Sequence, residues 1–138
     1  MESRTPSIVD LNAELANLTM FRGRTPQTTF ADRRGSAAQL APFRDGALIL
    51  SKSAGKGHWE THPGDELVYV LDGAFLEIVE KDGPQSFALG AGMMAIVPQG
   101  AWHRVHSPVS ISISMSTTRG QSIASRHEAW RLDASSRH

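Results

Sequence analysis

The sequence predicts an all-β domain, an antiparallel sandwich or barrel, preceded by a short helix. Between residues 47 and 117, short segments rich in β-branched and aromatic residues alternate with clusters of Gly, Pro and Asp. About eight such segments at this spacing are typical of a β-sandwich or β-barrel. The chain has 138 residues, which suits a single domain with a core of its own.

Residues 8–18 carry the pattern of a short amphipathic helix. Apolar residues recur at steps of three and four, at Ile8, Leu11, Leu15 and Leu18. Ser7 and Asp10 form an S-x-x-D capping box at the start of this segment. We expect the apolar stripe to dock on the outside of the domain or on a partner subunit.

Residues 22–46 are predicted to form a loop, because Gly and Pro recur throughout them. The segment is also rich in arginine, with Arg22, Arg24, Arg33, Arg34 and Arg44. Clustered guanidinium groups are suited to hold an anionic ligand or a carboxylate of a partner, and they are equally compatible with a solvated loop.

The strands that follow are separated by recognisable turns. The expected strands are 47–52, 57–62, 66–71, 74–80, 85–89, 93–97, 101–106 and 109–117. Asp72-Gly73 predicts a hairpin between strands 66–71 and 74–80. Pro108 is expected to separate the last two strands.

Metal-ligand residue types gather in the stretch that begins at Gly57. If residues 58–62 are extended, His58, Glu60 and His62 share one face, and Glu66 follows after the turn-forming Pro-Gly-Asp at 63–65. Imidazole nitrogens and carboxylate oxygens on one face are the ligands of a divalent metal. Since the Cα atoms of residues 58 and 62 would stand roughly 13 Å apart, we expect His58 to line the pocket mouth or support a ligand, as an acid or base.

These residues, together with a second stretch from Gly92 to His103, resemble the two conserved motifs of the cupin superfamily. The second stretch matches G-x5-P-x-G-x2-H, with Ser107 where the family often has Asn. The first matches H-x3-E-x6-G from His62 to Gly73, with Glu60 in the place of the family's first histidine. The resemblance covers residues from about 45 to 117.

The resemblance implies a small single-domain cupin with a double-stranded β-helix, the jelly-roll barrel. It further implies a site for one divalent transition metal, with His62, Glu66 and His103 as ligands and Glu60 as a fourth ligand or a pocket carboxylate. Two carboxylates favour Mn, Fe or Zn over Cu(I). The turn at 98–100 is expected to aim His103 inward, whereas His106 and the tryptophans Trp59 and Trp102 should face the other side.

The resemblance also divides the chain and suggests its assembly. We expect an N-terminal helix and loop extension over residues 1–44, a barrel core over 45–117, and a C-terminal extension over 118–138. The last of these is expected to pack on the barrel or on a dimer interface, with Trp130 as an anchor. Single-domain cupins commonly pair, so a homodimer is expected.

Two functions remain open at this point. The first is a small metalloenzyme that acts on a small polar or aromatic metabolite, with dioxygenase, isomerase or lyase chemistry. The second is a non-catalytic cupin that binds or senses a small-molecule ligand.

Composition argues against several other classes. Fourteen basic residues balance fourteen acidic ones, so the chain lacks the electrostatic footprint of a nucleic-acid-binding protein. No apolar run approaches the roughly 20 residues of a membrane helix, and the first ten residues lack the apolar core of a signal peptide. There is no cysteine. A cytoplasmic protein that contacts neither membrane nor nucleic acid is therefore expected.

Overall fold

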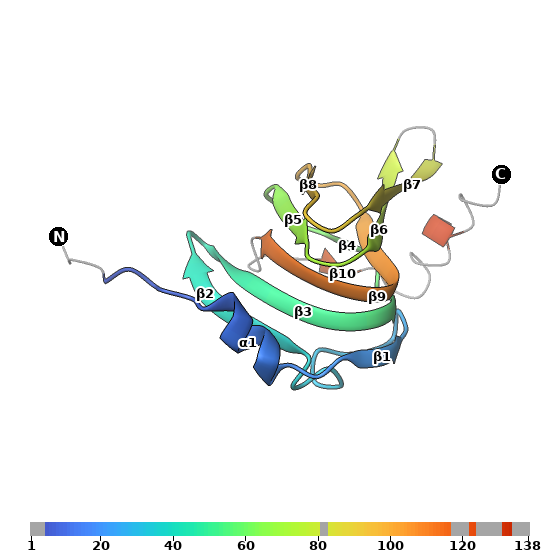
Figure 1. Ribbon diagram of the computed structural model, residues 1–138. Coiled ribbons are helices and arrows are strands. Elements are labelled where there is room, and N and C mark those ends of the chain that lie inside the picture. The colour runs from blue at the N-terminus through green and yellow to red at the C-terminus, as the bar shows by residue number, and fades with distance from the viewer. Residues whose placement is uncertain (1–4, 81–82, 117–121, 124–130, 134–138) are drawn as a thin grey trace.

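A computed structural model describes residues 5–80, 83–116, 122–123 and 131–133. Within these residues a short helix precedes strands that hydrogen-bond into one branched sheet, so the predicted all-β class with an N-terminal helix is confirmed (Figure 1). The elements are α1 (Leu11–Asn17), β1 (Phe21–Arg24), β2 (Ala37–Phe43), β3 (Gly46–Lys56), β4 (Glu60–Thr61), β5 (Glu66–Val70), β6 (Ala74–Glu80), β7 (Gly83–Leu89), β8 (Met94–Val97), β9 (His103–Ser116) and β10 (Ser122–Ile123).

Helix α1 is shorter than the predicted 8–18 because it is capped by Asp10 rather than by Ser7. The Asp10 side chain accepts a hydrogen bond from the Ala13 amide at 3.1 Å. At the other end of α1, Lys52 of β3 donates from Nζ to the carbonyl oxygens of Leu15 and Leu18, at 3.2 and 3.3 Å. Lys52 therefore ties the end of α1 to β3 and satisfies its open carbonyls. The predicted docking of the apolar stripe is not seen among the described residues, since α1 buries none of its side chains and Ile8 and Leu11 are exposed.

The prediction of a loop over residues 22–46 is wrong, since β1 and β2 both pair with β3. β2 runs antiparallel to β3 and β1 runs parallel to it. Among the described residues β2 pairs with β3 on one side only, so it is an edge strand. Pro42 is tolerated there because a missing amide proton on the open side of an edge strand costs no ladder bond. The Gly and Pro residues that predicted a loop therefore lie in and beside two edge strands, β1 and β2.

Strand β9 is the spine of the sheet, and it contains Pro108 instead of ending there. Over its length β9 pairs with β3, β4, β5 and β6. The pairing with β3 slips between Ser53 and Gly55, opposite Ser110 and Ser107. This bulge lets a proline sit within a strand without breaking the ladder on either side of it.

The predicted hairpin at Asp72-Gly73 is also wrong. β5 pairs with β8 and β9, whereas β6 pairs with β7 and β9, so β5 and β6 are not neighbours. The chain instead crosses from one end of β9 to the other, with the Gly73 amide bonded to the Asp72 carboxylate at 2.8 Å. Hydrogen bonds among the described residues do not close the sheet into a ring.

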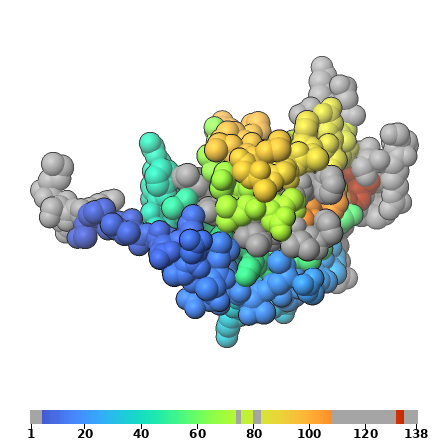
Figure 2. All heavy atoms as spheres, viewed as in Figure 1, coloured from blue at the N-terminus to red at the C-terminus, as the bar shows by residue number. Residues whose placement is uncertain are grey.

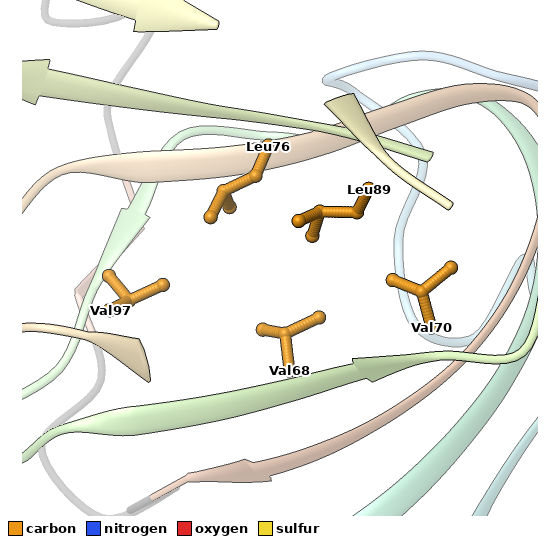
Figure 3. Close-up of a cluster of buried hydrophobic side chains, with 5 residues drawn as sticks. All are labelled: Val68, Val70, Leu76, Leu89 and Val97. Atoms are coloured by element: carbon orange, nitrogen blue, oxygen red, sulfur yellow. The ribbon is translucent and has the colours of Figure 1, made fainter. Parts of the chain in front are cut away.

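The core lies between the strands that flank β9. Five buried side chains point toward one another there: Val68, Val70, Leu76, Leu89 and Val97 (Figure 3). β5 buries every second residue, starting with Glu66. The register that buries the valines of β5 therefore also directs a carboxylate into the interior.

Residues 131–133, near the C-terminus, pack against Trp59 and Arg104 through Asp133. Trp59 is almost fully buried, as expected of a residue adjacent to the site residues, and its Nε1 donates to Asp133 at 3.2 Å. Arg104 stacks on the Trp59 ring and pairs with both Asp133 and Glu77, at 2.9 and 2.6 Å. The prediction for Trp130 falls outside the described residues.

In Figure 2 the N-terminal part of the chain, in blue, covers one side of the molecule beneath the green and yellow strands. No helix in the described ranges is long and apolar enough to span a membrane.

Candidate metal centre

Two stretches of sequence, residues 60–66 and the start of β9, deliver the four predicted ligands to one point. Glu60 opens β4, Glu66 opens β5 and His103 opens β9, while His62 lies just past the end of β4. Glu60 and His103 are register partners across β4 and β9. One nitrogen or carboxylate oxygen from each of the four residues lies within 4.8 Å of the others. The structure therefore gathers the predicted set into a single cluster that could hold a metal ion.

A turn between β8 and β9 fixes the loop that carries His62. The Gly100 amide donates to the His62 carbonyl at 2.9 Å, and the Gln99 amide donates to the Asp65 side chain at 2.9 Å. Gly100 has φ +77°, a conformation that glycine adopts without steric cost. The glycine of the second motif thus closes the turn that leads His103 inward, as predicted.

The two imidazoles present free nitrogens to the cluster. His103 donates from Nδ1 to the Ala101 carbonyl at 2.9 Å, and its buried Nε2 has no hydrogen-bond partner among the described residues. In the neutral imidazole this Nε2 carries the lone pair that a metal would take. His62 Nε2 lies 2.7 Å from Glu66 Oε2 but also lacks hydrogen-bond geometry. Buried nitrogens left unsatisfied, with carboxylate oxygens beside them, are the donor set that a divalent cation satisfies.

The balance of charges in the cluster also suits a divalent cation. Burial lowers the pKa of both histidines, but contacts with Glu60 and Glu66 outweigh it and raise the pKa of His62 to about 9 and of His103 to about 10. Burial conversely raises the pKa of both carboxyl groups, and the histidines outweigh it, so the pKa of Glu60 and Glu66 is lowered. The carboxylates of the buried Glu66 and the partly buried Glu60 are thus balanced by two positive charges, which either two protons or one divalent cation can supply.

Glu60 uses its two oxygens differently. Oε1 lies 3.6 Å from Nε2 of both His62 and His103, toward the cluster. Oε2 lies 3.1 Å from Nε2 of His58, which is partly buried. His58 therefore orients the carboxylate of Glu60, in addition to lining the cavity as predicted.

A cavity of about 500 Å³ opens onto the cluster. Glu60, His62 and Glu66 form part of its wall, while His103 is 1 % exposed and is not among the lining residues. The segment from Arg24 to Arg33 forms another part of the wall. The N-terminal extension therefore contributes to the cavity, through residues that the barrel motifs do not include.

Sequence reasoning identified the arginine-rich segment but could not tell which arginines matter. Of the five, only Arg24 and Arg33 line the cavity, and both are half-buried. The other three, Arg22, Arg34 and Arg44, are exposed. The pairing of β1 with β3 makes this selection, and the sequence carried no signal for that pairing because the segment reads as a loop.

His106 borders the cavity, but its imidazole pairs with Glu77 at 3.1 Å. Arg104 also pairs with Glu77, and it alternates with His103 along β9. His106 was predicted to face the other side, and its imidazole does pair with Glu77 and lies outside the metal-ligand cluster, but the residue also borders the cavity.

Comparison with known proteins identifies the family. Residues 48–112 match the model of the cupin domain family. The chain therefore contains a cupin domain, and the resemblance inferred from its two motifs is confirmed.

Solved structures support the same fold. A cupin-2 domain containing protein from Shewanella frigidimarina superposes with a TM-score of 0.56 at 21% identity, covering 86% of this chain and 96% of that chain. A cupin-like protein from Thermotoga maritima gives a TM-score of 0.56 at 17% identity, covering 70% and 82%. Hydroquinone 1,2-dioxygenase from Sphingomonas sp., solved with 4-hydroxybenzoate bound, gives 0.51 at 17% identity, covering 59% and 64%. A search of curated proteins found no match.

Proposed function

We propose that this protein is a small cupin metalloenzyme in which Glu60, His62, Glu66 and His103 hold one divalent transition metal, namely Zn, Fe or Mn. The observation that carries the proposal is the buried cluster of four ligand atoms within 4.8 Å, three of whose residues border a cavity. Two imidazoles and two carboxylates form an oxygen-rich set that suits these metals better than Cu(I).

When bound, the metal supplies Lewis acidity or, if it is iron, the capacity to activate O2. The protein's own residues account for the rest of the proposed chemistry. Hydrogen bonds at Nδ1 of His103 and at Oε2 of Glu60 fix the orientation of two ligands. His58 borders the cavity and its Nε2 shares a hydrogen bond with Glu60, so His58 is the residue proposed to accept or deliver a proton.

The substrate proposed for this site is a small polar or aromatic metabolite. A cavity of about 500 Å³ lies within the range of sites that bind small molecules. Metal-dependent dioxygenase, isomerase and lyase reactions can each act on an oxygen-bearing substrate beside the metal, and each is compatible with this donor set.

The proposal is tested by elemental analysis of protein purified without a His-tag and without added metal. We expect about one equivalent of transition metal in the wild type and loss of most of it in Glu60→Ala and His103→Ala. Full metal content in both variants would refute the four-ligand site. Loss in His103→Ala alone would leave a three-ligand site and give Glu60 another role.

His106→Ala is the matched control for the histidine substitution. His106 lies in the same strand as His103, but its imidazole pairs with Glu77 and is not part of the cluster. It should retain the wild-type metal content, so any loss in His103→Ala is specific to the cluster.

A non-catalytic binding or sensor cupin is the second candidate. One observation favours it: apart from the metal-ligand set and two arginines, His58 and His106 are the only titratable residues among the described lining of the cavity. A cavity with so few proton carriers suits binding without turnover. A metabolite that copurifies at one equivalent and stays unchanged on incubation with the metal-loaded protein would support this candidate over the enzyme.

We further propose that the chain forms a homodimer. Strand β8 pairs only with β5 among the described residues, and it exposes Met94 and Ile96 by more than half. An edge strand with exposed apolar side chains is a surface on which a second chain would bury area.

A further inference from the structure

Two arginines line the cavity, and neither has an ion-pair partner among the described residues. Arg24 and Arg33 both line it, and in each the Nε is buried without a hydrogen-bond partner. In the described part of the chain no carboxylate lies within ion-pair distance of either guanidinium. A buried guanidinium nitrogen without a partner is costly even when the side chain is only half-buried, so two of them beside a candidate site point to a ligand that supplies the missing charge.

Two glycines leave room for Arg24: Gly55 in the neighbouring strand β3, and Gly57 just after the end of that strand. A Cβ on Gly55 would overlap the Arg24 carbonyl oxygen, so only glycine lets β1 approach β3 this closely. A Cβ on Gly57 would lie 3.4 Å from Cζ of the Arg24 guanidinium. The guanidinium thus rests against bare backbone, next to the residues that lead into the metal-ligand stretch.

Arg33 is positioned by a segment that is ordered through its own hydrogen bonds. The Thr29 amide donates to Asp32 Oδ2 at 2.9 Å, and the Asp32 amide donates to Thr29 Oγ1 at 3.1 Å. The Arg33 amide donates to the Phe30 carbonyl at 3.1 Å. These reciprocal bonds fix the turn before a ligand arrives, which lowers the entropic cost of binding.

The charges facing the cavity leave an excess of positive charge. Burial lowers the pKa of Arg24 to about 10, with a further lowering by Arg33, and burial also lowers the pKa of Arg33. The more distant Glu60 raises the pKa of both arginines, but not enough to cancel the lowering. Both remain charged at neutral pH. A divalent ion balances Glu60 and Glu66, so the two guanidinium groups remain as net charge.

We propose that the ligand of this cavity is a small molecule with one or two oxyanion groups, a carboxylate or a phosphate, bound between Arg24 and Arg33. The guanidinium fork matches the oxygens of both anions. This inference rests on the proposed function, because it assigns the substrate or ligand class of the same site. It narrows the small polar or aromatic metabolite to an anionic one.

The test measures anion binding by calorimetry, on the full chain in zinc-loaded and metal-free forms. The probes are succinate, inorganic phosphate and neutral succinamide, which shares the carbon skeleton of succinate. We expect succinate or phosphate to bind about tenfold or more tightly than succinamide. The stronger of the two anions identifies the ligand as a carboxylate or a phosphate compound.

Substitutions then locate the binding. Arg24→Gln and Arg33→Gln should each weaken the preferred anion about tenfold or more, while the exposed Arg34→Gln should bind as the wild type does. Without ligand, both cavity variants should be at least as thermostable as the wild type, because each removes a half-buried charge that has no ion-pair partner among the described residues.

Three results would overturn the inference. They are equal binding of the anions and succinamide, unchanged anion binding in both cavity variants, and a drop in Tm of more than about 5 °C in both ligand-free variants, which would identify the arginines as structural. The metal-free arm separates this inference from the proposed function. Arginine-dependent anion binding by a protein that takes up no zinc would sustain the inference and refute the metalloenzyme.

Discussion

At the scale of single residues, Glu60 is where this site departs from the cupin motif that it resembles. A carboxylate in place of the first histidine adds a negative charge to a buried cluster. That charge is stabilised because Oε2 is held by His58 and Oε1 faces the two imidazoles. His58, which the motif does not include, is therefore the partner that makes this departure tolerable.

The histidine pKa values predict how metal binding depends on pH. In the metal-free protein His62 and His103 have pKa values raised to about 9 and about 10, so both are protonated at neutral pH. Binding of zinc must displace both protons. We expect the release of about two protons per zinc at pH 7, and an apparent affinity that rises with pH until about pH 10, the higher of the two histidine pKa values. Calorimetry in buffers of different ionisation enthalpy measures the release.

The same values predict the stability of the metal-free protein. Both histidines have pKa values above their unfolded value, so their stabilisation is complete below about pH 6.5 and is lost as pH rises through about 9 to 10. Glu60 and Glu66 have lowered pKa values, so their stabilisation is lost as pH falls below about 4.5. A metal-free Tm that rose between pH 7 and pH 10 would contradict the charge pairing of the cluster.

At the scale of elements, the parallel pairing of β1 with β3 decides which arginines face the cavity. Gly55 makes this pairing possible, with φ +118° and no room for a side chain beside Arg24. Gly55→Ala should therefore destabilise the fold by about 2–4 kcal/mol, through both backbone strain and steric overlap. It should also weaken anion binding, because β1 would have to move. Thermal or chemical denaturation measures the first effect and calorimetry measures the second.

Gly73→Ala is the control for that substitution. A Cβ added to Gly73 would meet no heavy atom within 4 Å, and the residue does not have a positive φ. Its substitution should change stability by less than about 1 kcal/mol. Equal effects of the two substitutions would show that the close approach of β1 to Gly55 is not required for the fold.

The elements also show where local sequence patterns are insufficient. Asp72-Gly73 has the composition of a hairpin turn, yet β5 and β6 lie on different stretches of β9. Pro108 has the composition of a strand end, yet a bulge absorbs it within β9. Both errors have one cause: a 14-residue strand that serves four neighbours overrides the local preferences of short segments.

At the scale of the whole molecule, the proposed homodimer is tested by sedimentation. The exposed apolar residues of β8 are Met94 and Ile96, with Met93 just before them. We expect a dimer at micromolar concentration, and Ile96→Lys should shift it toward the monomer by placing a charge in the interface. A wild-type chain that sediments as a monomer at that concentration would refute the proposal.

The sequence by itself determined the all-β class, the cupin family and the four candidate ligands. It could do so because glycine and proline punctuation, alternation along strands and motif spacing are local properties. The alternation that buries Val68 and Val70 also buries Glu66, so the position of that ligand follows from the pattern alone.

Only the tertiary structure decided the surroundings of those ligands. The partnership of His58 with Glu60, the entry of Arg24 and Arg33 into the cavity, and the docking of Asp133 on Trp59 and Arg104 all join segments distant in sequence or depend on side-chain direction. Such contacts depend on the packing of the whole chain, because each one forms only when the strands that carry its two residues are paired in the correct register.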